Sequence, residues 1–292
     1  MSDEVNPWAK WEDKAEPTVP TATLQIYKFI EEYLARAPDT HVNRASSATM
    51  CFKRRWYQKN GYEATPLTPR KIVNFTLGDL TEKVVLYFII KGCVGPGKLY
   101  SVVDFGMPIG SIFIQDKRIN IYDQEDLTAQ LGDIEVTAHV DGWGKRNSDG
   151  KWELIEVKSA ADYGFDKFKE NGPDDYLKQA MVNLQTNKAK ELGADSVRFF
   201  YLKKNTGHLW DRSFPFDPEL FKDVIEEFKI ANGSEEPKRP YLPVTEAFRG
   251  KPTGRKKLYW ACHYCPFTQT CWPEAELEFK NNSPLWILKE NK

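Results

Sequence analysis

The stretch that decides the fold is residues 132–160, GDIEVTAHVDGWGKRNSDGKWELIEVKSA. It contains two runs rich in β-branched and aromatic residues, Glu135–Trp143 and Trp152–Ala160, on either side of the sequence KRNSDG. Such runs around a cluster of Asn, Ser, Asp and Gly are typical of two strands joined by a short turn. We therefore expect an antiparallel pair of strands here.

Charged side chains within these two strands are expected to meet. Successive side chains of a strand point to opposite faces, so His139 shares a face with Asp141, and Glu156 shares a face with Lys158. If the strands pair through KRNSDG, then Asp141, Glu156 and Lys158 converge at one place. A Mg²⁺ or Mn²⁺ ion suits such a place, because it takes carboxylate oxygens together with water and substrate phosphate.

Phosphodiester hydrolysis is the chemistry that this set of residues would support. A divalent ion polarises the scissile phosphate and activates water, and Lys158 would stabilise charge on the phosphoryl oxygens. The solvated face of an ordinary strand also alternates Asp, Glu and Lys, so the pattern alone leaves both interpretations open. His139 is a candidate for metal binding or proton transfer, or else a hydrogen-bonded structural residue.

The rest of the chain is expected to surround these strands with helices. Apolar spacing and capping residues predict helices at about Thr21–Ala37, Ser46–Lys59, Val73–Lys91, Asp175–Leu192 and Pro218–Ala231. In the third of these, one apolar face is predicted from Leu77, Leu80, Val84, Val85 and Phe88. SIFIQD (111–116) and RINIY (118–122) alternate like the two strands of a hairpin, and further strands are predicted at residues 196–203 and 208–216. This order predicts a mixed sheet flanked by helices, not a repeating βαβ fold.

Composition excludes several classes of protein. The 292 residues are 41% apolar and 28% charged, which is the profile of an ordinary globular protein with a large core. Apolar runs such as Val84–Ile90 are too short to span a bilayer, and the N-terminal sequence lacks the apolar segment of a secretory signal. We expect a cytoplasmic location. A net charge of −1 neither supports nor excludes nucleic-acid binding, which depends on where the charges lie.

Three of the five cysteines lie close together near the C-terminus. The sequence CHYCPFTQTC places Cys262, Cys265 and Cys271 at a C-x2-C-x5-C spacing. In a reducing compartment, clustered cysteines indicate a metal centre, and an all-sulfur tetrahedral set holds zinc or an iron–sulfur cluster. The candidates for a fourth ligand are Cys51, Cys93 and, for zinc, His263.

Both sets of residues together resemble the PD-(D/E)xK nuclease superfamily. The resemblance is narrower to the RecB-like exonucleases, which include the CRISPR-associated iron–sulfur exonucleases and their viral relatives. In that pattern a helix with G-x-x-x-[H/E] precedes an aspartate, then E-x-K, then Q-x-x-x-Y. This chain has, in the same order, Gly78 with Glu82, Asp141, Glu156 with Lys158, and Gln179.

The resemblance implies a restriction-endonuclease-like α/β core, with a central mixed sheet flanked by helices, and a helical iron–sulfur region built from both termini. It implies that Glu82 is a further metal ligand, with Gly78 allowing its helix to approach the sheet closely. It also implies that Gln179 sets the catalytic lysine or contacts DNA. Four residues after Gln179, where the pattern expects a tyrosine, this chain has Asn183. Tyr176, one turn before Gln179, is a candidate substitute.

The same resemblance favours an iron–sulfur cluster over zinc at the cysteines. These families carry one cysteine in an N-terminal helix, before the nuclease motifs, and C-x2-C-x5-C after them. Cys51 matches the first position. The implied centre is a 4Fe–4S cluster on Cys51, Cys262, Cys265 and Cys271, with structural zinc as the alternative, and Cys93 is expected to be a free thiol.

Four segments follow from this assignment. They are a flexible N-terminal arm (1–20), an N-terminal helical region with the first cluster cysteine and the first metal-ligand helix (21–95), the PD-(D/E)xK nuclease core (96–232), and a C-terminal iron–sulfur and basic region (233–292). Basic and aromatic residues flank the cysteines on both sides. The candidates for DNA contact among them are Lys53, Arg54, Arg55, Trp56, Tyr57, Arg255, Lys256 and Lys257. The aromatic rings would stack on unpaired bases, or else pack in a core.

The expected activity is a Mg²⁺- or Mn²⁺-dependent DNA exonuclease that acts on single-stranded or resected ends, in recombination, repair or DNA processing. DNA is the expected partner, together with a recombination or single-strand-binding protein, and no membrane. One alternative is a nuclease-dead DNA-binding or scaffolding subunit, against which the intact Asp141, Glu156 and Lys158 argue. The other is a structure-specific or sequence-specific endonuclease on the same core.

Overall fold

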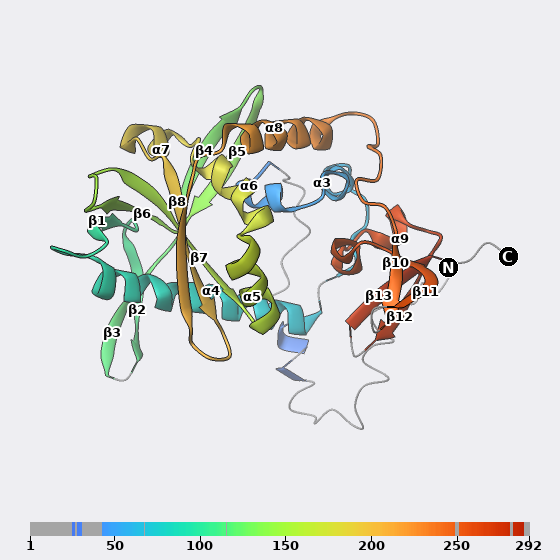
Figure 1. Cartoon of the computed structure of the whole chain (residues 1–292), viewed down its shortest axis with the longest axis horizontal. Coiled ribbons are helices and arrows are strands. Elements are labelled where there is room, and N and C mark those ends of the chain that lie inside the picture. The colour runs from blue at the N-terminus through green and yellow to red at the C-terminus, as the bar shows by residue number, and fades with distance from the viewer. Residues whose placement is uncertain are drawn as a thin grey trace. The chain divides into compact units, whose positions relative to one another are not determined.

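The chain folds into two compact units (Figure 1). The computed structural model describes residues 25–26, 28–30, 43–66, 68–114, 116–248, 251–280 and 283–288. The core unit comprises residues 43–50 and 74–230, and the cysteine unit comprises residues 1–42, 51–73 and 231–292. The predicted arm 1–20 lies outside the described residues, as does most of the predicted helix 21–37.

A five-stranded mixed sheet forms the centre of the core unit. Its order is β1 (Tyr100–Asp104), β6 (Gly142–Arg146), β7 (Trp152–Ala160), β8 (Ser196–Lys203) and β9 (Leu209–Pro215). The pair β7–β8 is parallel and the other three pairs are antiparallel. Parallel neighbours need a long crossover, and this one contains α5 (Asp162–Asn171), α6 (Asp174–Asn183) and α7 (Asn187–Leu192). The predicted strands β7, β8 and β9 are confirmed, as is the pairing of β6 with β7.

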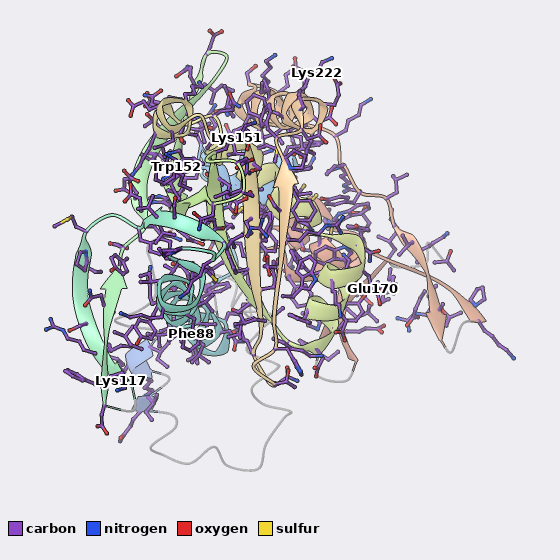
Figure 2. All side chains as sticks on the ribbon, turned by 60° about the vertical axis from the view of Figure 1, so that its left-hand side comes forward. Phe88, Lys117, Lys151, Trp152, Glu170 and Lys222 are labelled. Atoms are coloured by element: carbon purple, nitrogen blue, oxygen red, sulfur yellow. The ribbon has the colours of Figure 1, made fainter. Side chains whose placement is uncertain are left out.

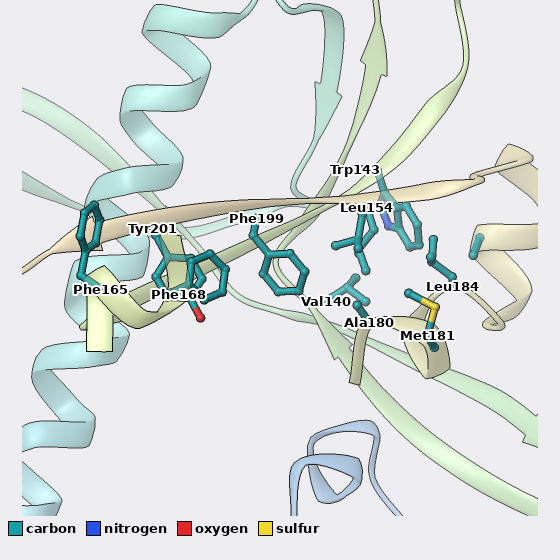
Figure 3. Packing of buried hydrophobic residues seen from close by; sticks show 12 residues of the cluster. Val140, Trp143, Leu154, Phe165, Phe168, Ala180, Met181, Leu184, Phe199 and Tyr201 are labelled. Carbon is teal, nitrogen blue, oxygen red and sulfur yellow. The ribbon is translucent and has the colours of Figure 1, made fainter. Parts of the chain in front are cut away.

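Helices cover both faces of this sheet. Side chains of α4 (Pro69–Cys93) pack against one face, where Val85, Leu86 and Ile89 meet Ile155, Val157 and Phe200. Helices α5 and α6 pack against the other face, where Phe168 and Met181 join Leu154, Phe199 and Tyr201 (Figure 3). The alternation of β7 and β8 sends successive residues to the two cores. The predicted class, a mixed α/β fold with a central mixed sheet flanked by helices, is confirmed.

The strand predicted at Glu135–Trp143 is wrong in one respect, because it is broken at Asp141. Its first part, β5 (Ile134–Val140), pairs with β4 (Glu125–Leu131) in a separate two-stranded sheet, and its second part is β6. Gly142 starts β6 beneath the ring of Phe105, which would lie only 2.0 Å from a Cβ at this position. A side chain there would collide with that ring, so the turn into the central sheet requires glycine.

The remaining helices of the core unit close a second apolar core over β4 and β5. Residues of η2 (Ala45–Thr49), α6 and α8 (Pro218–Asn232) pack there with Leu131, Val136 and Phe228. The single helix predicted at Asp175–Leu192 proves to be two, α6 and α7, because Thr186 caps the second with its hydroxyl oxygen, which accepts from the N–H of Ala189. The helix predicted at Ser46–Lys59 likewise divides into η2 and α3 (Phe52–Lys59).

The buried face of α4 differs from the predicted one. Of the predicted face, Leu77, Leu80 and Phe88 are exposed. Val85 is buried as predicted, together with Leu86 and Ile89, which the prediction did not include. Gly78 has no atom within 4 Å of the place where a Cβ would stand, so the expected close approach of the helix at this glycine is also wrong. Figure 2 shows Phe88 on α4 and Lys117 at the turn between β2 (Pro108–Ile114) and β3 (Lys117–Tyr122), the predicted hairpin.

The cysteine unit is only partly helical, which corrects the expectation of a helical region. It contains α3, η3 (Trp260–Tyr264), α9 (Thr268–Cys271) and an antiparallel four-stranded sheet. The order of that sheet is β10 (Val244–Phe248), β11 (Lys251–Lys257), β13 (Ser283–Leu288) and β12 (Ala275–Lys280). In β12, AELEFK alternates apolar and polar residues, which explains the strand. Among the described residues of the whole chain, no helix is long and apolar enough to cross a membrane.

The apolar core of the central sheet can be tested with two phenylalanines. Phe199 is fully buried between β8 and α6, whereas Phe113 on the β2–β3 hairpin is 73% exposed. Phe199→Ala is expected to lower the free energy of unfolding by about 3–5 kcal/mol, because it leaves a cavity. Phe113→Ala is expected to change it by less than about 0.5 kcal/mol. Urea denaturation of both variants measures the difference, and equal effects would contradict this description of the core.

Candidate metal centre and cysteine site

Asp141 lies at the break between β5 and β6 and is 2% exposed. Its Oδ2 accepts a 2.7 Å hydrogen bond from the backbone N–H of Val157 on β7, and its Oδ1 accepts one of 2.7 Å from Nε2 of Gln124. Because Gly142 pairs with Ile155, the preceding residue Asp141 stands beside Glu156. The two carboxylates therefore meet as the sequence predicted.

Glu156 and Lys158 project from β7 toward α6. The ammonium of Lys158 forms an ion pair with Oε1 of Glu156, and Nε2 of Gln179 on α6 donates to the same oxygen at 3.4 Å. The Lys158 Nζ also stands 5.2 Å from the centre of the Tyr176 ring. The other oxygen of Glu156, Oε2, is buried and has no hydrogen-bond partner among the described residues. Such an oxygen is costly to bury without a partner.

Glu82 reaches the same site from α4. Its side chain is largely buried, and Oε1 is paired with Lys83 at 2.9 Å. Its Oε2 lies 3.4 Å from Nε2 of Gln124, which also donates to Asp141. The predicted convergence of Glu82 with the strand carboxylates is thus present, although Gly78 does not cause it.

Burial and mutual repulsion raise the pKa values of these carboxyl groups. Burial, followed by the charge of Asp141, raises the pKa of Glu82 to about 8. Burial also raises the pKa of Glu156 to about 7; Lys158 opposes this shift and Asp141 adds to it. Burial lowers the pKa of Lys158, but Glu156 and Asp141 outweigh it and the net shift is upward. When no cation offsets their charge, both carboxyl groups therefore keep a proton up to a higher pH than they would in water.

The donor set fits a hard divalent cation. It offers carboxylate oxygens from three elements, including the unpartnered Oε2 of Glu156, and Mg²⁺ and Mn²⁺ prefer such oxygens. In the described residues, no three His, Cys, Asp or Glu side chains approach closely enough to hold one ion. The carboxylates are instead engaged by Gln124, Lys158 and the Val157 N–H, so these contacts would have to adjust around a cation.

His139 and Asn183 lie apart from these acids and Lys158. His139 pairs through Nδ1 with Asp126 at 2.7 Å, opposite it in the β4–β5 ladder, and its side chain is half-exposed. Because the strand breaks at Asp141, the shared face expected for His139 and Asp141 is wrong. Asn183 is fully buried on α6, with neither side-chain polar atom hydrogen-bonded in the described part of the chain. The ring near Lys158 belongs to Tyr176.

In the cysteine unit, Cys51, Cys262, Cys265 and Cys271 lie near enough to act on one another electrostatically, although among the described residues no three of them are close enough to hold one metal ion. Cys51 precedes α3, Cys262 lies in η3, and Cys265 and Cys271 begin and end the turn that includes α9. Burial raises the pKa of Cys262 to about 12, and the nearby thiols of Cys265, Cys51 and Cys271 raise it further. The hydroxyl of Thr268 donates to the backbone carbonyls of Cys262 and Cys265 and so fixes this turn.

Positive side chains surround these four thiols. The charges of Arg55 at Cys51, Arg54 at Cys265, and Lys53 and Arg239 at Cys271 each oppose the upward pKa shift that burial causes. Lys53 is buried and paired with Glu236 at 2.6 Å, and Arg55 is fully buried. The expectation that Lys53 and Arg55 contact DNA is therefore wrong: their charges lie inside, beside the sulfurs.

The aromatic residues of α3 are also internal. Trp56 and Tyr57 pack with Phe267 against Cys265 and Cys271. The Trp56 Nε1 donates to the carbonyl of Gly233 at 3.1 Å, and the Tyr57 hydroxyl donates to Glu236 at 2.7 Å. Their predicted stacking on bases is wrong, and the alternative, packing around the cysteines, holds.

The basic residues of β11 are more accessible. Lys256 is exposed and donates to the hydroxyl of Thr245 at 3.0 Å, and Lys257 is half-buried. Arg255 pairs with Glu278 at 2.5 Å. These three, with the half-buried Arg54, remain candidates for contact with phosphates.

The other candidates for a fourth ligand are differently placed. His263 is buried, its Nδ1 accepts from the N–H of Trp286 at 2.9 Å, and it also hydrogen-bonds to the backbone of Leu258. Its ring thus hydrogen-bonds to the backbone. Cys93 ends α4 in the core unit and packs beside Tyr100 and Phe105. Burial raises its pKa, and the charges that act on it are those of Asp211, Lys98 and Arg198.

Sequence reasoning missed Gln124. A glutamine between two strands matches no motif, and only its position, two residues after the predicted RINIY strand, links it to the site. It also missed Arg239, which covers the Trp272 ring at 3.9 Å and adds a cation near Cys271. The proline-rich segment around it gave no signal.

Comparison with known proteins adds little. No protein-family model matches the sequence, and no curated protein matches it. A solved structure described as "Crystal structure of SSO0001" is similar over 87% of this chain and 96% of its own, with 14% identity and a TM-score of 0.44. A likeness at this level carries no conclusion about chemistry.

The raised pKa of Glu82 predicts how metal-free stability depends on pH. Its value is 4.5 ordinarily and about 8 in the fold, so the folded state holds the additional proton between these values. That stabilisation is present below the lower value and is lost as the pH rises through the upper one. When the pH is raised from about 6 to about 9 in EDTA, the melting temperature of Glu82→Gln is expected to fall less than that of wild type. Glu170→Gln, on exposed α5 residue Glu170, is the control and should follow wild type. Parallel curves for all three proteins would contradict the assignment.

The grouping of the cysteines predicts which of them hold the metal centre. Protein purified without oxygen is expected to be brown, with about four irons per chain. Cys51→Ser should remove the colour and lower the melting temperature by roughly 5–10 °C, because the loss of metal removes folding free energy. Cys93→Ser should keep both. Iron analysis and visible absorbance decide the matter, and stoichiometric zinc in colourless protein would overturn the expectation.

Proposed function

We propose that the protein is a Mg²⁺- or Mn²⁺-dependent DNA nuclease with a restriction-endonuclease-like core. The observation that carries the proposal is the buried, unpartnered Oε2 of Glu156, beside Asp141 and next to the ammonium of Lys158. The ion pair with Lys158 engages Oε1 alone, and Oε2 stays buried without a partner among the described residues, which is costly. A divalent cation accounts for it, because it takes carboxylate oxygens and relieves the repulsion between Asp141 and Glu156.

The residues of the chain divide the work of phosphodiester hydrolysis. In this reaction a water oxygen bonds to phosphorus, the bond to a sugar oxygen breaks, and a proton passes to that leaving oxygen. Asp141, Glu156 and Glu82 would hold the cation, which would supply Lewis-acid polarisation of the phosphate. Lys158 keeps its proton, because its pKa is raised, and stabilises negative charge developing on the phosphoryl oxygens.

Two residues of α6 set the position of Lys158. Gln179 donates to Oε1 of Glu156, the oxygen that also holds the lysine. The centre of the Tyr176 ring lies 5.2 Å from the ammonium, and such a ring attracts a cation. Tyr176 takes the role that the resemblance gives to a tyrosine at position 183. If Glu156 bound a metal, Tyr176 would keep Lys158 directed at the site.

The proposed substrate is DNA with a free single-stranded or resected end, processed in recombination, repair or DNA processing. The cysteine unit is proposed to hold a 4Fe–4S cluster, since four thiols interact there, the ring of His263 is engaged by the backbone, and the charges of nearby cations favour the thiolate forms. Lys256, Lys257, Arg255 and Arg54 are the proposed phosphate contacts. A recombination or single-strand-binding protein is the proposed partner, and the proposed location is the cytoplasm.

Digestion of end-labelled linear DNA with Mn²⁺ tests the proposal. Asp141→Ala and Glu156→Ala should show no activity, since each removes a charged ligand. Lys158→Ala should lower kcat by about 10²- to 10³-fold, by analogy with loss of one transition-state donor, and should retain Mn²⁺ binding. Lys151→Ala, at an exposed lysine of the turn before β7, is the control and should match wild type. Full activity in Asp141→Ala would sink the assigned site. An inactive wild type that still binds DNA would favour the scaffolding alternative.

A closed circle of single-stranded DNA separates the two nuclease alternatives. An exonuclease needs an end, so the circle should resist digestion while the linear strand of the same sequence is degraded. Cleavage of the circle at a comparable rate would instead establish an endonuclease on this fold.

A further inference from the structure

Gln124 occupies the gap between two carboxylates that come from different parts of the core unit. It lies directly before β4, and its amide nitrogen donates to Oδ1 of Asp141 at 2.7 Å and approaches Oε2 of Glu82 at 3.4 Å. Asp141 stands at the β5–β6 break, whereas Glu82 projects from α4. One NH₂ group thus faces both acids.

The position of this amide matches the place of a cation. An NH₂ group carries two donor hydrogens, and here it stands where two negative oxygens converge, as a positive ion would. It is neutral, however, and so does not supply the charge that a cation would. A half-turn of the amide about its last side-chain bond would exchange nitrogen and oxygen. Without a cation that turn is unfavourable, because it would replace the hydrogen bond to Asp141 by a contact between two oxygens.

We propose that Gln124 is a further residue of the metal site: its amide nitrogen holds Asp141 and Glu82 together when metal is absent, and its amide oxygen binds the cation when metal is present. The inference rests on the proposed function, since it concerns the same cation. Neutral amide oxygens are suitable partners for hard divalent ions, and they add a ligand without adding repulsion. This explains why a glutamine, and not a fourth acid, faces Asp141.

Binding of Mn²⁺ itself, measured by calorimetry on the full chain, tests this role without any nuclease assay. Gln124→Ala removes both the bridge and the ligand and is expected to weaken Mn²⁺ binding by about 10- to 100-fold. Gln124→Glu restores an oxygen ligand but cannot donate a hydrogen bond. It is therefore expected to bind Mn²⁺ at least as tightly as wild type, and to melt at a lower temperature than wild type in EDTA.

The control is Gln130→Ala on the same strand region. Gln130 lies in β4 and is exposed. Its side-chain amide donates to the carbonyl of Gly132 at 2.8 Å. This variant should bind Mn²⁺ as wild type does. Its behaviour separates an effect of the site from a general effect on β4.

The outcomes of the titration are distinguishable. If wild type binds no Mn²⁺, the proposed metal-dependent function fails, and this inference with it. If Asp141→Ala loses binding while Gln124→Ala binds as wild type does, the proposed site stands and the role of Gln124 is overturned. Gln124→Glu binding more weakly than Gln124→Ala would overturn the amide oxygen as a ligand, because a carboxylate at that place would then only repel its neighbours.

Discussion

The core unit depends on one hydrogen bond, from the backbone N–H of Val157 to Oδ2 of Asp141. It joins β7 to the point where the chain leaves the β4–β5 sheet and enters the central one. A buried carboxylate at such a break satisfies a backbone donor that would otherwise lack a partner. The same bond fixes Asp141 beside Glu156. The strand break that ends one ladder thereby creates the place where two acids meet.

Burial gives this place its chemical character. Three acids and one lysine gather where water is excluded, and the pKa of Glu82 and of Glu156 both rise toward or above neutrality. Charge in such a site needs a counter-charge, and in the described structure Lys158 supplies it to Glu156. In the cysteine unit, the positive charges of Lys53, Arg54, Arg55 and Arg239 oppose the upward pKa shift that burial causes in the thiols. Two residues of a basic segment that resembles a DNA-binding surface in sequence, Lys53 and Arg55, are buried there.

Several features of the site could be predicted from sequence because they depend on local periodicity. The alternation of ELIEVKSA places Glu156 and Lys158 on one side, and the spacing of the cysteines places three thiols in one turn. Cys51 and Glu82 required a resemblance, since each lies far along the chain from its partners. The structure groups both of them with those partners.

Other features depend on tertiary packing, which periodicity does not encode. The break at Asp141 interrupts a run whose alternation continues through it, so His139 was expected on the wrong side. The need for glycine at position 142 follows from the ring of Phe105, which packs against it in the folded protein. Trp56, Tyr57 and Arg55 have a composition that suits either a nucleic-acid surface or a core around sulfur. Gln124 belongs to the site through a single side-chain contact, for which a sequence offers no pattern.

The account is tested most directly by locating a metal ion in crystals of the full chain grown with Mn²⁺. An anomalous difference map at the manganese edge should show one peak in the core unit, with oxygens of Asp141 and Glu156 at about 2.0–2.3 Å from it. Lys158 should then have left Oε1 of Glu156 while remaining near Tyr176. Crystals in millimolar Mn²⁺ with no peak between these acids, and with Gln124 and Lys158 still holding them, would contradict the account.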